Sequence, residues 1–65
     1  MASPSTSANV YDSLGDGLMA AGDPAAAAAQ YEIAVRRAEA IAHPALAVYR
    51  TNLEAARKQL SEKQR

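Results

Sequence analysis

The tripeptide Gly22-Asp23-Pro24 restricts the possible folds of this 65-residue chain more than any other feature. Glycine tolerates the left-handed geometry that ends many helices, aspartate is a preferred N-cap residue, and proline suits the first helical position. On both sides of the tripeptide, apolar residues recur every three or four positions. This spacing predicts two amphipathic helices joined by a very short turn.

A second boundary is predicted at His43-Pro44, because proline disfavours helical geometry in the residue before it. A kinked continuation of one long helix is the alternative. Ser7 is the expected N-cap of the first helix. The predicted helices cover about residues 8–21, 24–42 and 44–61. Together they form one domain, 8–61, between a flexible lead, 1–7, and a frayed tail, 62–65.

Composition also favours an all-α fold. About a quarter of the residues are alanine, and β-branched residues are too scattered to predict a strand. A chain this short buries only about 60% of the surface that its unfolded form exposes, so disulfides, a metal or oligomerisation are the usual aids to stability. Without cysteine and with one histidine, the chain is expected to self-associate or to attach to a larger body.

The distribution of charged and apolar residues argues against binding to nucleic acid and against insertion into a membrane. The net charge of zero divides into −3 for residues 1–31 and +3 for residues 32–65. This asymmetry could steer the acidic half of one copy toward the basic half of another, and it is unlike the basic surface of a nucleic-acid-binding protein. No apolar run is long enough for a membrane span, and residues 1–7 lack the features of a signal peptide.

The third predicted helix has one narrow apolar seam and a charged opposite face with Arg50, Glu54, Arg57 and Lys58. Such a helix is typical of a lid or a coiled-coil partner, and we expect its seam to be shared between chains. The residues predicted to pack or to form interfaces across all three helices are Tyr11, Leu14, Leu18, Tyr31, Leu46, Tyr49, Leu53 and Leu60.

Residues 8–41 follow the 34-residue tetratricopeptide pattern of an aromatic, Leu-Gly, a turn, a small residue, a second aromatic and alanine. The matching residues are Tyr11, Leu14-Gly15, Gly22-Asp23, Ala27, Tyr31 and Ala34. The chain therefore resembles a single tetratricopeptide repeat followed by a capping helix. It departs from the pattern near Glu39, where a closing proline is usual.

The resemblance implies that Gly15 lets the second helix approach, with Ala27 opposite. It also implies a ligand-facing surface on the first helix, formed by Asn9, Asp12, Asp16 and Met19, which would suit a basic ligand. Asp12 and Asp16 are four residues apart and share a helix face; for their carboxylates a solvated face is favoured over a cation site or an acid–base pair. Because such repeats generally need about three copies for stability, one repeat should pair with itself or with a host domain.

A narrower resemblance concerns the nine residues from Ser7 to Gly15, Ser-Ala-Asn-Val-Tyr-Asp-Ser-Leu-Gly. This string is similar to the start of the short repeat tail that follows the catalytic domain of some bacterial serine hydrolases, both esterase-like and β-lactamase-like. It implies an accessory tail that affects activity or assembly only through a catalytic domain.

No catalytic, cofactor or metal site is predicted. His43 has no acid or cysteine at metal-ligand spacing except Glu39, and it is expected to interact with backbone carbonyls at a helix end. Ser13 is not in a Gly-x-Ser-x-Gly element, and Gly15-Asp16-Gly17 is too short for a phosphate loop. The sequence therefore predicts a non-enzymatic module for protein interaction and self-association, without a cofactor.

Overall fold

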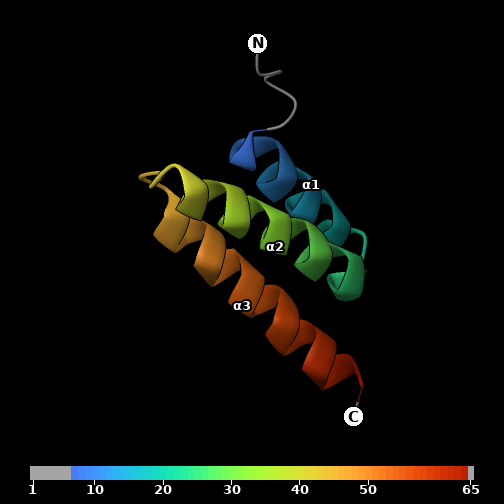
Figure 1. Ribbon diagram of the computed structural model, residues 1–65. Coiled ribbons are helices and arrows are strands. Elements are labelled where there is room, and N and C mark those ends of the chain that lie inside the picture. Colours follow the sequence, from blue (N-terminus) through green and yellow to red (C-terminus); the bar gives the residue numbers. More distant parts are fainter. Residues whose placement is uncertain (1–6, 65) are drawn as a thin grey trace.

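The computed structural model describes residues 7–64, which fold into three helices and their connecting turns (Figure 1). The helices are α1, Ala8–Ala20, α2, Pro24–Ala40, and α3, Leu46–Lys63. Within this range there is no strand, so the predicted all-α fold class is confirmed. Residues 1–6 of the predicted lead and Arg65 of the predicted tail lie outside the described part of the chain.

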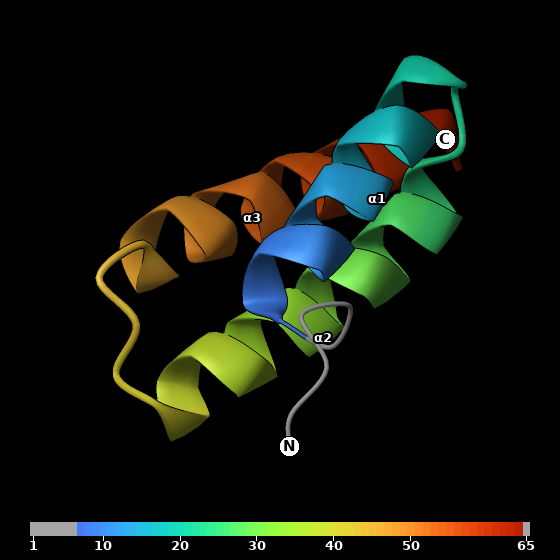
Figure 2. The same ribbon diagram turned by 90° about the horizontal axis from the view of Figure 1, so that it is seen from above.

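The helices follow one another as antiparallel neighbours, with α2 between α1 and α3 (Figure 1). α2 packs extensively against both neighbours, whereas α1 and α3 make few contacts with each other. Seen from above, α1 and α3 lie on the same side of α2 rather than in one plane with it (Figure 2). The principal-axis extents are 44 × 19 × 12 Å.

The first turn has the predicted geometry. Gly22 has a φ of +81°, and the backbone N–H groups of Gly22 and Asp23 donate to the carbonyls of Met19 and Leu18. These two bonds form the Schellman arrangement that satisfies carbonyls at a helix end. The Asp23 carboxylate accepts from the Ala26 N–H at 3.2 Å, and Pro24 begins α2.

The second turn repeats this arrangement with a different residue. The N–H groups of Ala42 and His43 donate to the carbonyls of Glu39 and Ala38, and Ala42 has a φ of +50°. α2 therefore ends at Ala40, two residues before the predicted end. Alanine is disfavoured in this left-handed conformation, so the residue type at position 42 did not indicate a helix end.

Ser7 is the N-cap residue of α1, as predicted, but its side chain makes no capping hydrogen bond. Two further expectations about helix ends need correction. The His43 side chain makes its hydrogen bond to an N–H group rather than to a carbonyl: its Nδ1 accepts from the Ala45 N–H at 3.0 Å. α3 begins at Leu46 rather than Pro44 and continues through Glu62 to Lys63, so the first half of the predicted frayed tail is helical.

The core lies where α2 meets the other two helices. α2 contributes small residues and one aromatic, so the helix axes can approach closely, and α3 contributes larger side chains. Half-buried residues of α1, including Tyr11, Leu18 and Met19, pack against this core. The buried apolar residues are Ala8, Ala27, Tyr31, Ala34, Val35, Ala38, Tyr49, Leu53 and Ala56.

Candidate interaction surface

The predicted ligand-facing surface of α1 is largely occupied by contacts within the chain. Asp12 accepts a hydrogen bond from the Asn52 amide of α3 at 2.9 Å. Asp16 accepts from the Tyr31 hydroxyl of α2. Met19 is half-buried against the core. Each carboxylate therefore links α1 to a neighbouring helix, while Asp16 is exposed, as a solvated face requires, and Asp12 is half-buried.

The remaining predicted member of this surface, Asn9, is exposed. The sequence contained no signal for the two carboxylate contacts, because Asn52 and Tyr31 lie 40 and 15 residues away along the chain. A basic ligand on this face would bind carboxylates whose Oδ1 atoms already accept a hydrogen bond from another helix. We therefore place the strongest candidate surface elsewhere on α1.

Burial raises the pKa of Tyr31, and the hydrogen bond to Asp16 and the negative charges of Asp16 and Asp12 raise it further. A phenol with a raised pKa stays protonated at neutral pH and acts as a donor. Tyr31 therefore serves as a structural link between α2 and α1, because its ring is buried and its hydroxyl ends on a carboxylate.

The seam of α3 is not free. Tyr49 and Leu53 are only 4% and 8% exposed, and half-buried Leu46 packs against the same core. Leu60, nearer the end of α3, is also half-buried. Tyr49 and Leu53 are therefore used in the core between α3 and α2, and a seam shared between chains stays a prediction for the less buried positions Leu46 and Leu60.

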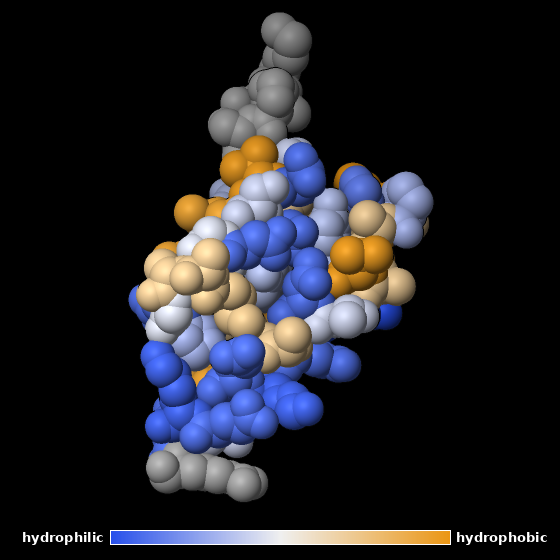
Figure 3. All heavy atoms as spheres, turned by 180° about the vertical axis from the view of Figure 1, so that it is seen from behind, coloured by the Kyte–Doolittle hydropathy of each residue, from blue (hydrophilic) through white to orange (hydrophobic). Residues whose placement is uncertain are grey.

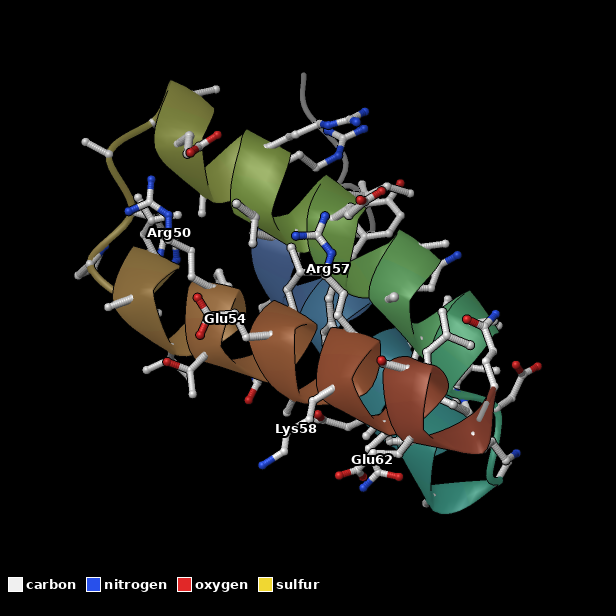
Figure 4. All side chains as sticks on the ribbon, turned by 90° about the horizontal axis from the view of Figure 1, so that it is seen from below. Arg50, Glu54, Arg57, Lys58 and Glu62 are labelled. Carbon is white, nitrogen blue, oxygen red and sulfur yellow. The ribbon has the colours of Figure 1, made fainter. Side chains whose placement is uncertain are left out.

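The charged side of α3 reaches toward α2 rather than only into solvent (Figure 4). Arg50 pairs with Glu39, and Arg57 with Glu32, each at 2.8 Å. All four side chains are at least 40% exposed, so each pair contributes little to stability. These pairs link α3 to α2 along their exposed edge. Arg50 and Arg57 are two of the four residues that were predicted to form the charged outer face of the third helix.

In the part of the chain that the structure describes, the exposed large apolar side chains are Val10, Leu14, Ile41 and Val48. Leu14 is 50% exposed, so the prediction that it packs within the chain is wrong. Val10, 40% exposed, precedes Leu14 by four residues and lies on the same face of α1. One view of the molecule shows hydrophobic groups separated by hydrophilic residues rather than one continuous patch (Figure 3).

Next to α1, the outer surface of α2 has a shallow open groove lined by Ile33, Arg36, Arg37 and Ala40. The Arg37 guanidinium lies over the Tyr11 ring, 5.1 Å from its centroid, which is a cation–π distance. Nothing in the sequence indicated this contact, since it joins side chains 26 positions apart in the chain.

Among residues 7–64, no group of acids and histidine could hold a metal ion. No helix in that range is long and apolar enough to cross a membrane. No protein-family model, curated protein or solved structure matches the chain. The resemblance to tetratricopeptide repeats therefore rests on its own residues.

Proposed function

We propose that this chain is a non-catalytic protein-interaction module of the tetratricopeptide type, and that α1 carries its binding surface. The observation that supports the proposal is the pair Val10 and Leu14. They lie one turn apart on the side of α1 that neither α2 nor α3 covers, and they are 40% and 50% exposed.

The rest of the fold positions this pair. Tyr31 and Asn52 hold α1 from behind through the two carboxylates Asp16 and Asp12, so α1 presents a fixed outer face. An apolar row on a rigid helix suits a partner that is itself an amphipathic helix. Removing the two side chains from water supplies the main driving force for association.

The alternative proposal is an accessory tail of a serine hydrolase. It is favoured by the string from Ser7 to Gly15, which spans the N-cap and the N-terminal part of α1 and includes both Val10 and Leu14. In that case the partner is a catalytic domain. A Ser-x-x-Lys or Gly-x-Ser-x-Gly element in the same open reading frame would support this proposal, and an open reading frame of 65 codons would remove it.

The proposed function is tested by measuring whether the chain associates with itself, and whether it associates with any other segment that the same open reading frame encodes. Light scattering over a dilution series gives the molar mass in each case. Leu14→Asp should abolish association while circular dichroism stays helical, because the side chain is half exposed. Val48→Asp is the matched control, since Val48 is 57% exposed on α3.

Two results would contradict the proposal. One is that the chain stays a monomer of 6.8 kDa at every concentration and also binds no other segment that the same open reading frame encodes. The other is association that Leu14→Asp leaves as strong as in the unchanged chain.

A further inference from the structure

His43 lies in the turn between α2 and α3 and makes a hydrogen bond that depends on its protonation state. Its Nδ1 accepts from the backbone N–H of Ala45 at 3.0 Å. A ring nitrogen accepts a hydrogen bond only while it carries no proton, so this bond requires the neutral imidazole with its proton on Nε2. His43 is the only histidine in the chain. The bond is therefore sensitive to pH in the range where histidine titrates.

This bond lies at the start of α3, where the sequence provides no ordinary helix cap. The N-cap residue is Ala45, which makes no side-chain capping bond, and the first turn of α3 contains no acid. The imidazole therefore satisfies one of the backbone N–H groups that a helix cannot satisfy by itself at its N-terminus. At most helix starts a Ser, Thr, Asp or Asn side chain accepts from such a group, and none of these titrates near neutral pH.

The His43 ring also contacts the first turn of α3 through its packing. The side chain is half-buried, and its ring centroid lies 5.5 Å from that of Tyr49, with the two planes tilted by 40°. Tyr49 belongs to the buried core, and half-buried Leu46 packs against the same core. The imidazole therefore connects the turn with the two side chains that attach the first turn of α3 to the rest of the fold.

We propose that His43 is a pH-sensitive switch for the docking of α3. The neutral imidazole holds the first turn of α3 in place. Protonation replaces the acceptor lone pair on Nδ1 with a second N–H group, which breaks the bond to Ala45. It also puts a positive charge beside a helix N-terminus, where cations are disfavoured. The first turn of α3 then loosens from the core. This switch is independent of the binding surface on α1.

The charged and titratable groups of the neighbouring elements do not replace the lost bond. Glu39, in the last turn of α2, pairs with Arg50 of α3 at 2.8 Å. Tyr49 presents its ring to His43, and tyrosine is uncharged in the pH range where histidine titrates. On α1, Asp12 accepts a hydrogen bond from a side-chain amide of α3. The carbonyls at the end of α2, which would favour a cation, already accept from N–H groups of the turn.

The direction of the pH effect follows from proton linkage. A histidine in an unfolded chain takes up its proton near about pH 6.5, whereas the folded chain loses the bond to Ala45 when it does so. The unfolded state therefore binds more protons in this range, and it is favoured as the pH falls. The stabilisation is fully present near pH 8 and is lost between about pH 7 and pH 5. Urea denaturation followed by circular dichroism should give an equilibrium constant for unfolding that is about fivefold to tenfold larger at pH 5 than at pH 8.

Two variants isolate the contribution of the imidazole. In His43→Asn the side-chain oxygen Oδ1 occupies the same place along the side chain as Nδ1, and it accepts a hydrogen bond without titrating. All carboxylates are retained, so the difference between the two pH profiles belongs to His43, and most of the change between pH 8 and pH 5 should disappear. His43→Ala lacks the acceptor at every pH. It should be less stable than the unchanged chain at pH 8 and show the same flat profile as His43→Asn.

Nitrogen NMR of the imidazole tests the same inference in the unchanged chain, without a substitution that disturbs folding. At pH 8 the spectrum should show the proton on Nε2 and an unprotonated Nδ1, the form that accepts from Ala45. A proton on Nδ1 at pH 8 would overturn the inference. Equal pH dependence of stability in the unchanged chain and His43→Asn between pH 5 and pH 8 would overturn it as well.

Discussion

The ring of Tyr31 packs directly over the backbone of Gly15: a Cβ at position 15 would lie 2.5 Å from Cε1 and 2.9 Å from Cζ. Because Tyr31 is only 3% exposed, its ring cannot move aside freely. Gly15→Ala should therefore lower the free energy of unfolding by about 1–3 kcal/mol, although alanine is the better helix former. Chemical denaturation followed by circular dichroism measures the change.

Gly17→Ala is the matched control for this prediction. At a concentration where the chain is monomeric, the new methyl group meets nothing, and the free energy of unfolding should rise by up to about 1 kcal/mol. The two substitutions have the same chemistry and opposite expected signs. Equal changes at positions 15 and 17 would show that helix propensity, rather than contact with Tyr31, governs both.

Alkaline pH should destabilise the chain through Tyr31. Its pKa is raised in the folded state by burial and by Asp16, whereas the unfolded value is about 10. The stabilisation is therefore fully present below about pH 10 and is lost as the pH rises above that value, because the unfolded state releases the proton more readily. Denaturation between neutral pH and pH 11 measures the slope.

Tyr31→Phe isolates the contribution of this hydroxyl. The variant loses the hydrogen bond to Asp16 and should be less stable at neutral pH by about 1 kcal/mol. Its stability should then fall less steeply above pH 10 than that of the unchanged chain. If both proteins have the same alkaline slope, the titration of Tyr31 is not linked to folding.

Structural features that depend only on residues close together in the sequence could be predicted. The turn at Gly22, Asp23 and Pro24 is one, since each residue has a local preference for its position. The end of α2 could not be placed as well, because Ala42 adopts a left-handed conformation that its residue type disfavours. There, hydrogen bonds and the path into α3 override local preference.

The candidate surface depended on longer-range information. A spacing of three and four residues predicts a stripe, but it allows either of two adjacent faces of α1 to point inward. Tyr31 packs on Gly15, and this turns Leu14 outward. Periodicity likewise predicted the seam of α3, but it could not determine whether the covering helix belongs to the same chain. The partners of Asp12 and Asp16 are equally non-local.

Leu53→Ala should unfold much of the protein. Leu53 is 8% exposed in the α2–α3 core, and truncating a buried leucine costs about 2–5 kcal/mol. A single core in a domain below about 70 residues rarely supplies more than 3–5 kcal/mol, so little stability would remain. The helical signal in circular dichroism at 25 °C, together with the denaturation midpoint, measures the loss.

Val48→Ala is the control for Leu53→Ala, because Val48 is on the same helix and 57% exposed. Its change in stability should be within about 0.5 kcal/mol of zero. A large loss for Val48→Ala with a small loss for Leu53→Ala would mean that α3 presents the opposite face to α2.

The two turns allow a reciprocal substitution, because Gly22 and Ala42 occupy equivalent positions in two Schellman arrangements. Ala42→Gly should stabilise the fold by about 0.5–1 kcal/mol: it relieves the left-handed strain of about 1–2 kcal/mol but adds conformational freedom to the unfolded chain. Gly22→Ala should destabilise it by about 1 kcal/mol, since its Cβ meets no neighbour and only the φ of +81° opposes it. Thermal and urea denaturation of both variants measure the changes. Destabilisation by Ala42→Gly would show that α2 continues past Ala40 in solution.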